Sequence, residues 1–242
     1  MSTSRTYVIT GASKGIGLAT ATQLAAEGHK VIGLARTRPE DTSAFVEFIP
    51  VDLSSQPDRT PVFQDVAARY PIDGVLNNVG LVNPAPLEDI TLEDFDAVID
   101  MNLRVAIQLT QAALPGMKER KWGRIVSTSS LVTVGVPFRT SYAAAKSGLI
   151  SFTRSWSLEL APHGITVNAV APGPVATELF NTNNPPGSES RQRYIDGIPM
   201  KRTGTPEELA AANCFFLGET SSFVTGQTLY VDGGSSIGHA PV

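Results

Sequence analysis

Thr10-Gly11-Ala12-Ser13-Lys14-Gly15-Ile16-Gly17 follows an apolar run that begins at Tyr7, and it opens a helical pattern that extends to about Glu27. We expect the run to be a buried strand and Gly28 to end the helix. The glycines permit a tight turn and close approach of a diphosphate to the helix N-terminus. Their spacing is G-x-x-x-G-x-G, not the commoner G-x-G-x-x-G, and such a turn alone could be a simple connection. Between a strand and a helix it predicts a nucleotide site that contains Gly11, Ser13, Lys14, Gly15, Ile16 and Gly17.

Short β-branched runs alternate with longer helical patterns along the rest of the chain. This alternation predicts a parallel sheet covered by helices on both faces. The polar stretch 181–193, rich in Asn, Pro, Gly and Ser, predicts a mobile loop. Helices are expected at 92–114 and 206–217. Strands are expected at 7–10, 31–34, 48–51, 74–76, 125–128, 165–169 and 228–231.

Composition limits the class of protein. With 242 residues, 42% of them hydrophobic, the chain can bury a sizeable core, and we expect one domain over residues 1–242. The net charge is −4 without a basic block, which favours neither a nucleic-acid partner nor an anionic membrane. The N-terminus lacks a charged and then apolar leader, and no apolar run is long enough to span a bilayer. We therefore expect a cytoplasmic protein.

The single cysteine, Cys214, lies in an apolar run at 214–217. An internal disulfide is therefore impossible, and a buried structural thiol is a better interpretation than a nucleophile. Cysteine and histidine do not cluster along the sequence, so we expect no metal site.

Ser141-Tyr142-Ala143-Ala144-Ala145-Lys146 places a phenol and an ammonium four residues apart in a helical run. Tyr142 and Lys146 would therefore share one face of the helix. A lysine near a tyrosine favours the phenolate, which gives a proton donor and acceptor usable near neutral pH. Alone, the pair could simply belong to an amphipathic surface helix. The other motifs of the chain favour the catalytic interpretation.

Taken in order along nearly the whole chain, these motifs resemble those of a short-chain dehydrogenase/reductase of the classical type. The resemblance implies a doubly wound, seven-stranded parallel sheet of Rossmann type, a nicotinamide cofactor, and reversible hydride transfer between a carbonyl and an alcohol. The motifs that carry it are Thr10 to Gly17, Asp52-Leu53, Asn77-Asn78-Val79-Gly80, Asn102, Ser129-Ser130, Tyr142 with Lys146, Pro172-Gly173, and Val231-Asp232-Gly233-Gly234.

The resemblance also assigns roles to single residues. In the family, the asparagine matched by Asn102 bends its helix and holds a water next to the catalytic lysine. Val79 stands where alanine is more frequent, which we interpret as a packing variant. Adenine would lie near Asp52 and Leu53 at the end of the third strand, and the crevice beside the fourth strand would be lined by Asn78, Val79 and Gly80. Contacts to the nicotinamide end would come from Pro172, Gly173, Val175 and Thr177.

Two serines compete for the catalytic position. Alignment on the strand before them selects Ser130, whereas the usual separation from Tyr142 selects Ser129. We choose Ser130 because the end of a strand fixes side-chain direction, while a loop absorbs a one-residue deletion. Ser130 would stabilise the substrate oxygen as negative charge develops, and Tyr142 would protonate it. Lys146 would lower the pKa of Tyr142 and hold the ribose hydroxyls of the cofactor.

The choice of cofactor depends on the residues after the second strand. Ala35-Arg36 offers no carboxylate to bind the ribose hydroxyls of NAD, and Arg36 suits a 2′-phosphate. Lys14 adds a second positive charge near the same group. Either residue alone could be an ordinary surface cation. Together they predict NADP(H).

The substrate is less well defined. The pattern at 198–202 and the ending at 231–234 are similar to those of bacterial 3-oxoacyl-carrier-protein reductases. Those reductases usually offer two basic residues to an acidic carrier protein, and the matching positions are Lys121 and His163. One histidine in an acidic chain weakens that docking, so a free ketone is at least as well supported. An apolar pocket could be lined by Val134, Val136, Pro137, Phe138 and Leu179.

The sequence also bears on two alternative functions, on a substrate lid and on the oligomeric state. A cofactor-sensing protein without catalysis is disfavoured by the intact set of Asn102, Ser130, Tyr142 and Lys146. A sugar epimerase or dehydratase would need a substrate domain that this length does not accommodate. We expect a substrate lid over about 178–204. The family pairs the helices at 92–117 and 141–160 between subunits, so we expect a homotetramer, with Leu149, Ile150, Phe152 and Trp156 as apolar contacts.

Overall fold

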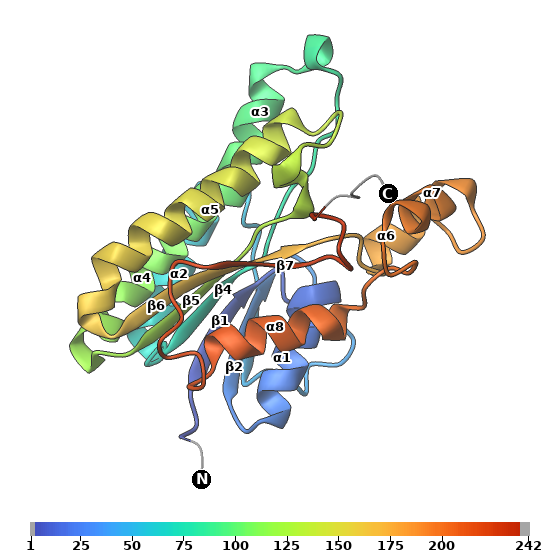
Figure 1. Cartoon of the computed structure of the whole chain (residues 1–242). Coiled ribbons are helices and arrows are strands. Elements are labelled where there is room, and N and C mark those ends of the chain that lie inside the picture. Colours follow the sequence, from blue (N-terminus) through green and yellow to red (C-terminus); the bar gives the residue numbers. More distant parts are fainter. Residues whose placement is uncertain (1–2, 238–242) are drawn as a thin grey trace.

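The computed structural model describes residues 3–237, which form a seven-stranded parallel sheet in the order β3-β2-β1-β4-β5-β6-β7 (Figure 1). The sequence-based prediction of the fold class is confirmed, and each predicted strand is present to within a few residues. The order reverses between β1 and β4, which opens a crevice at the carboxyl ends of the strands. The strands are β1 (Thr6–Thr10), β2 (Lys30–Ala35), β3 (Glu47–Pro50), β4 (Gly74–Asn77), β5 (Gly123–Thr128), β6 (Ile165–Pro172) and β7 (Thr228–Val231).

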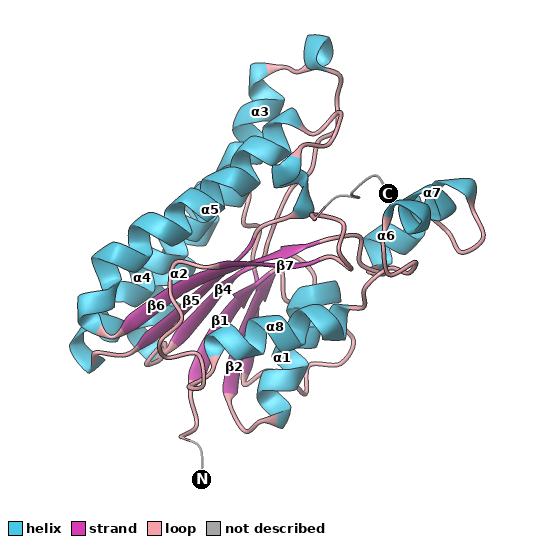
Figure 2. Cartoon of the chain, in the orientation of Figure 1, coloured by secondary structure: helices cyan, strands magenta, loops and turns pink. Residues whose placement is uncertain are grey.

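Helices cover both faces of the sheet (Figure 2). One face packs against α1 (Gly15–Ala26) and α8 (Pro206–Leu217), and the other against α2 (Gln56–Arg69), α4 (Val105–Arg120) and α5 (Thr140–Leu160). Successive strand residues point to opposite faces, so β1 supplies both cores. Val8 lies in the core beneath α2 and α4, while Tyr7 and Ile9 lie in the core beneath α1 and α8. Burial on both faces explains why the strands have uninterrupted apolar sequences.

The helix predicted at 92–114 is divided in the structure. After α3 (Leu92–Ile99), the backbone forms one π turn over Asp100–Arg104 before α4 begins. Asn102 lies in this turn, and its side-chain amide donates a hydrogen bond to the Val98 carbonyl at 2.8 Å. That carbonyl would otherwise accept only from the backbone, so the asparagine competes with the regular helix. Turns of this kind occur often at functional sites.

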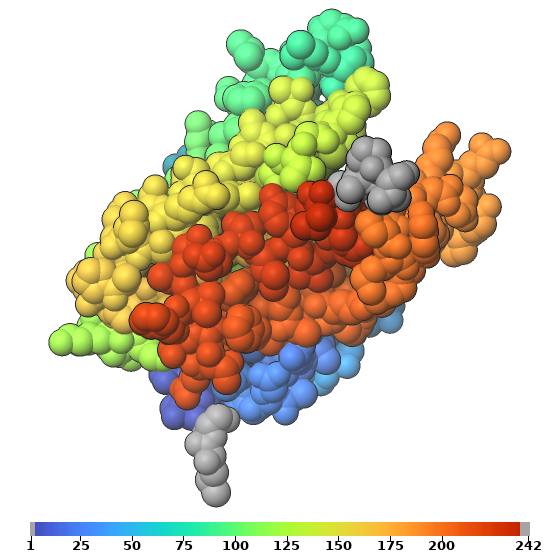
Figure 3. Space-filling view, in the orientation of Figure 1, coloured from blue at the N-terminus to red at the C-terminus, as the bar shows by residue number. Residues whose placement is uncertain are grey.

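The prediction of a mobile loop at 181–193 is wrong for most of that segment. The segment contains α6 (Glu178–Asn183) and α7 (Glu189–Gly197), which project from the body of the molecule (Figures 1 and 3). Thr177 caps α6 by accepting from Phe180 N, and Ser188 caps α7 by accepting from Arg191 N. Side chains typical of loops thus serve as helix caps, which composition alone does not distinguish.

Residues 3–237 contain neither a membrane-spanning helix nor a cluster of metal-ligating side chains. None of the helices there has the length and apolar character needed to cross a bilayer. In the same range, no group of three or more His, Cys, Asp or Glu side chains is arranged to hold a metal ion. Cys214 is buried in α8, as expected for a structural thiol, and burial raises the pKa of that thiol to about 12.

Candidate active site

A cavity of about 1120 Å³ opens at the carboxyl ends of β1, β2, β3 and β4. It is large enough for a dinucleotide, because ligand pockets commonly measure about 300–1,000 Å³. Half of the predicted cofactor-binding residues line it: Gly11, Ser13, Lys14, Arg36, Asp52, Leu53, Asn78, Val79 and Gly80. A neighbouring hollow of about 460 Å³ is lined by Gly15 and Thr177 instead.

The glycine turn is fixed to the end of β4. Asn78 donates from its side-chain amide to the carbonyls of Thr10 and Gly11, at 3.1 and 3.2 Å. The Thr10 hydroxyl accepts from the backbone N–H groups of Asn78 and Val79. Gly11 has φ +65°, and a Cβ on Gly17 would clash with the Gly11 carbonyl. The sequence therefore needs glycine at both positions to bring the turn this close to the helix N-terminus.

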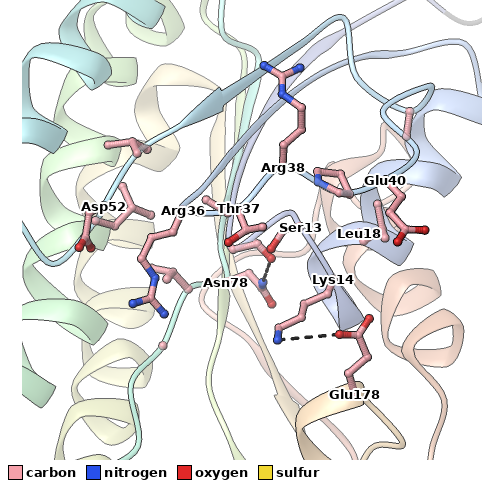
Figure 4. A pocket seen from close by; sticks show the side chains of 18 of the residues that line it. Ser13, Lys14, Leu18, Arg36, Thr37, Arg38, Glu40, Asp52, Asn78 and Glu178 are labelled. Carbon is pink, nitrogen blue, oxygen red and sulfur yellow. Dashed lines mark hydrogen bonds and ion pairs between the residues drawn. The ribbon is translucent and has the colours of Figure 1, made fainter.

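The adenine end of the cavity, which we define as Ser13, Lys14, Arg36, Asp52 and Glu178, is charged and exposed (Figure 4). Lys14 Nζ lies 3.8 Å from Glu178 Oε2, and the two side chains are 58% and 72% exposed. Arg36 follows directly after β2, as predicted, and forms no ion pair within 4 Å among residues 3–237. Hydrogen bonds from Ser54 lower the pKa of Asp52, and the charge of Arg36 adds to this effect.

Sequence analysis missed a second arginine in the wall of the same cavity. Arg38 donates to the Phe48 carbonyl at 2.9 Å, and its guanidinium lies 5.7 Å from the centroid of the Phe48 ring. Its side chain is thus turned away from Arg36 (Figure 4). The signal in the sequence was the pair of arginines at 36 and 38, which alternation along an extended chain would place on the same side. The chain bends directly after β2, so the two side chains diverge. Carboxylates at Glu40 and Asp41 also line this wall, so its charge is mixed.

The catalytic end, which we define as Asn102, Ser130, Tyr142 and Lys146, is much more enclosed. None of these four residues lines the cavity itself. Lys146 is 1% exposed and donates from Nζ to the Thr128 carbonyl at 2.7 Å. Burial lowers its pKa to about 7 because an ammonium without an anionic partner is costly to desolvate. Nζ lies 5.4 Å from the centroid of the Tyr142 ring, so the predicted shared face is confirmed.

The predicted direction of the Tyr142 pKa shift is wrong for this structure. Burial raises the pKa of the phenol to about 12, and a hydrogen bond with Ser130 and the charge of Arg139 offset only part of the rise. Lys146 does not lower this pKa because its ammonium points to the Thr128 carbonyl and is itself easily deprotonated. Arg139 was also missed, although it is the residue directly before α5 and precedes Tyr142 by only three residues.

The two serines take different partners. Ser129 is buried, and its hydroxyl donates to the Lys146 carbonyl at 3.0 Å. This hydrogen bond connects α5 to the end of β5. Ser130 is only half-buried, accepts from Val132 N, and forms the hydrogen bond with Tyr142 that affects the phenol pKa. This arrangement agrees with the choice of Ser130 as the serine next to the tyrosine.

Asn102 presents an unpaired acceptor to the catalytic end. Its amide donates to the carbonyls of Val98 and Leu81, whereas its Oδ1 is buried without a partner among the described residues. A Cβ built on Gly80 would lie 2.9 Å from that Oδ1 and 3.4 Å from Lys146 Nζ. Gly80 therefore leaves open the space that both groups border.

The remaining predicted contacts are less closely grouped. Val175 is buried and pairs with Gly204, and Thr177 is the N-cap of α6. A Cβ on Gly173 would clash with Asp232, so Pro172-Gly173 packs closely against the motif at 231–234. The proposed apolar pocket residues Val134, Val136, Phe138 and Leu179 are all exposed. Phe138 has φ +62°, an unusual backbone conformation for a bulky side chain.

A doubly wound parallel sheet, a glycine turn that opens its first helix, and a buried lysine beside a tyrosine together define a dinucleotide-dependent oxidoreductase. A family model described as enoyl-(acyl carrier protein) reductase matches residues 11–236. The chain belongs to the short-chain dehydrogenase/reductase family.

Three relatives illustrate the match. The 3-oxoacyl-[acyl-carrier-protein] reductase of Thermotoga maritima is 37% identical over 238 residues, which cover 94% of this chain and 96% of the relative. A putative NAD(P)-dependent gluconate 5-dehydrogenase from Beutenbergia cavernae, solved with bound NADP, is 32% identical with a TM-score of 0.91 and covers 97% of each chain. A 3-oxoacyl-(acyl-carrier-protein) reductase from Agrobacterium tumefaciens, also with NADP bound, is 30% identical with a TM-score of 0.85 and covers 95% of this chain and 93% of its own.

Proposed function

We propose that this oxidoreductase reduces ketones to secondary alcohols with NADPH, and that Tyr142 is its proton donor. The observation that carries the proposal is the enclosed phenol of Tyr142, in contact with Ser130 and on the same face as Lys146. A pKa of about 12 keeps that phenol protonated at neutral pH, which is the form needed to protonate a carbonyl oxygen.

The residues present fit NADP(H). Gly11 leaves backbone room for a diphosphate, and Arg36, which has no ion-pair partner among residues 3–237, offers its guanidinium to a 2′-phosphate. Lys14 would be the second cation for that phosphate. Asp52 and Leu53 would hold the adenine, with Tyr142 and Lys146 at the nicotinamide end. Two solved relatives with NADP bound support the same cofactor.

Each residue of the catalytic end has a separate task in this proposal. The cofactor supplies the hydride that reduces the carbonyl carbon. Tyr142 donates its proton to the carbonyl oxygen, and Ser130 stabilises that oxygen while charge develops. Lys146, with a pKa near 7, can then return a proton toward the tyrosine. Asn102 Oδ1, which has no partner among residues 3–237, would accept a hydrogen bond on the route between Lys146 and solvent.

A second candidate is reduction of a 3-oxoacyl thioester. It is favoured by the carrier-protein reductases of similar sequence, including the relative from Thermotoga maritima. The two positions that would dock a carrier protein, Lys121 and His163, directly precede β5 and β6. They therefore lie at the amino edge of the sheet, opposite the edge that carries the cavity. A carrier docked there would not face the Tyr142 of the same subunit.

A ketone panel tests the function and separates the candidates. Purified enzyme is mixed with NADPH and either a 3-oxoacyl thioester or the free ketoester of the same chain length, and the loss of absorbance near ~340 nm is followed. Turnover of the ketoester supports the general ketone reductase. Turnover of the thioester alone would transfer the assignment to acyl metabolism. Cofactor binding without turnover of any ketone would favour a sensing protein.

The assembly is proposed on the apolar surface of α5. Leu158 is 80% exposed, and Phe152 stacks on Trp156 with ring centroids 5.0 Å apart. Leu149, one of the predicted contacts, is buried within the subunit and is not available. We propose that the remaining surface pairs with its copy in a homotetramer. Light scattering that gives a monomer mass at micromolar concentration would contradict this.

A further inference from the structure

Arg59 of α2 is completely buried, although it is an arginine and lies outside the catalytic end. Its guanidinium donates two hydrogen bonds to the Asp100 carboxylate, at 2.5 and 2.8 Å. It also donates to the Leu53 carbonyl at 2.7 Å and to Gln108 Oε1 at 2.6 Å. One side chain therefore joins the segment after β3, the π turn and α4. A buried charge with this many partners fixes their relative positions.

The partner of Arg59 is the first residue of the π turn. Asp100 is followed two residues later by Asn102, and the whole turn spans Asp100–Arg104. The bonds from Arg59 lower the pKa of Asp100, so the carboxylate remains charged near neutral pH. Arg104 also approaches Asp100, at 3.6 Å, but its side chain is 59% exposed and adds a weaker contact. Arg59 is therefore the stronger of the two contacts that hold the turn.

The conformation of the π turn determines where the Asn102 side chain points. Asn102 is 2% exposed, and both of its donor bonds go to carbonyls, Val98 and Leu81. Its unpartnered Oδ1 is left bordering the space beside Gly80 and Lys146 Nζ. A regular helix at this place would rotate every later residue of the turn and move that oxygen away.

We propose that Arg59 is a positioning residue for Asn102: by holding Asp100 it maintains the π turn that aims Asn102 Oδ1 at the proton route of Lys146. This inference rests on the proposed function of the catalytic end. It adds a residue of α2, some forty residues before the turn in sequence, to the machinery of proton delivery.

The test is a double-mutant cycle between Arg59 and Asn102. In Arg59→Met, we expect kcat for ketone reduction to fall by about ten- to a hundredfold with KM little changed, because misplacement of the proton route slows turnover. In an Asn102→Ala background the same substitution should cause no further loss of kcat. Equal losses in both backgrounds, or an unchanged kcat in Arg59→Met, would overturn the proposal.

A second variant separates positioning from stability. Arg59→Met alone leaves the half-buried Asp100 carboxylate with only the exposed Arg104 nearby, and it could fail to fold for that reason. Arg59→Met/Asp100→Leu replaces the pair with apolar side chains, which restores stability in comparable cases. We expect this double variant to melt near the wild-type temperature and still to have the reduced kcat. Recovery of full kcat would show that the pair is only structural.

Two controls complete the design. Arg69→Met removes two ion pairs of an exposed arginine on the same helix, one with Asp65 of α2 and one with Glu47 of β3, and should leave kcat unchanged. Hydrogen exchange of the Asp100–Arg104 amides needs no substrate and should be faster in Arg59→Met/Asp100→Leu. Unchanged exchange would refute the positioning role even if no ketone were turned over by the wild type. Absence of turnover by the wild type with altered exchange would instead count against the proposed function alone.

Discussion

The adenine end of the nucleotide cavity and the catalytic end, which borders that cavity at Gly80, are built in opposite ways. At the catalytic end, Lys146 and Asn102 are almost completely buried, and Lys146 Nζ and the Asn102 amide donate short hydrogen bonds to backbone carbonyls. At the adenine end, Lys14 and Glu178 are mostly exposed and meet at 3.8 Å. Desolvated groups interact strongly and have shifted pKa values, whereas exposed pairs contribute about 0–1 kcal/mol.

This difference implies different uses. The catalytic end must hold a few atoms in place during a reaction, and its charges are therefore placed where water cannot screen them. The adenine end must recognise a phosphate and release it again, which exposed cations can do with little reorganisation. Substitutions at the catalytic end should therefore have large effects that salt does not change, and those at the adenine end smaller, salt-dependent ones.

The largest effect is expected for Tyr142→Phe at the catalytic end. Loss of the phenol removes the proton donor, so kcat should fall by roughly a thousandfold or more, within the range usual for general acids. NADPH affinity, measured by fluorescence titration, should change little because the ring remains. The matched control is Tyr70→Phe, at the C-terminal end of α2 and near the amino edge of the sheet. An active Tyr142→Phe enzyme would refute the mechanism and, with it, the functional contrast between the two ends.

The second prediction concerns stability and pH. Burial lowers the pKa of Lys146 from its ordinary value to about 7, so between about pH 7 and 10.5 the unfolded chain binds a proton that the folded chain does not. The contribution of Lys146 to stability therefore rises with pH across this window, and below about pH 7 its full penalty remains. Lys146→Met lacks this penalty.

Chemical denaturation at several pH values measures this difference. At about pH 6, Lys146→Met should be more stable than the wild type, and the gap should narrow toward pH 10. Other titrating groups cancel because both proteins contain them. A gap that is constant over this range would mean that the ammonium is not desolvated, and would remove the main distinction between the two ends. Lys118→Met, in the last turn of α4, provides a control with an ordinary surface lysine.

The same contrast explains how far the sequence alone could predict the structure. The sheet and the glycine turn were predictable because buried parallel strands and a strand-turn-helix motif have strong local signals. The residues Tyr142 and Lys146 share a face because of their spacing, which is also local. By contrast, the buried Arg59, the orientation of Lys146 toward the Thr128 carbonyl, and the raised pKa of Tyr142 depend on contacts between segments distant in sequence.

Predictions from composition were the least reliable. A segment rich in Ser, Asn and Pro was expected to be irregular, yet Thr177 and Ser188 start α6 and α7. Likewise, two arginines at positions 36 and 38 look equivalent in the sequence. Only the structure separates them, because the Phe48 carbonyl holds Arg38 while Arg36 has no ion-pair partner among residues 3–237.

The third prediction concerns Arg36 at the adenine end. A charge-assisted contact to the 2′-phosphate contributes about 1.5–3 kcal/mol, so NADPH should be preferred over NADH by at least about tenfold in kcat/KM. Arg36→Asp should narrow or invert that ratio and leave kcat at saturating cofactor largely intact, since the change is remote from the hydride. Arg38→Gln should alter the ratio less, because its guanidinium already binds the Phe48 carbonyl. Equal use of both cofactors by the wild type would contradict the role of Arg36.

The smallest effect is expected at Glu178, the first residue of α6. Its carboxylate lies beside Lys14 and competes with a phosphate for that ammonium. Glu178→Gln keeps the size of the side chain and removes the charge, so Lys14 becomes fully available. Because the pair is exposed, we expect NADPH to bind only about two- to fourfold more tightly, while binding of NADH is unaffected.

The dependence of cofactor binding on salt concentration tests this prediction about Glu178. Titrations of both cofactors in about 0.02 M and about 0.5 M salt should show the gain for NADPH at low salt and its loss at high salt, where exposed charges are screened. Glu207→Gln, in the first turn of α8 and outside the nucleotide cavity, is the matched control for the loss of one negative charge. An equal gain for NADPH and NADH would mean that Lys14 contacts a phosphate common to both cofactors. The 2′-phosphate would then be recognised by Arg36 alone, and the adenine end would contain one specificity residue instead of two.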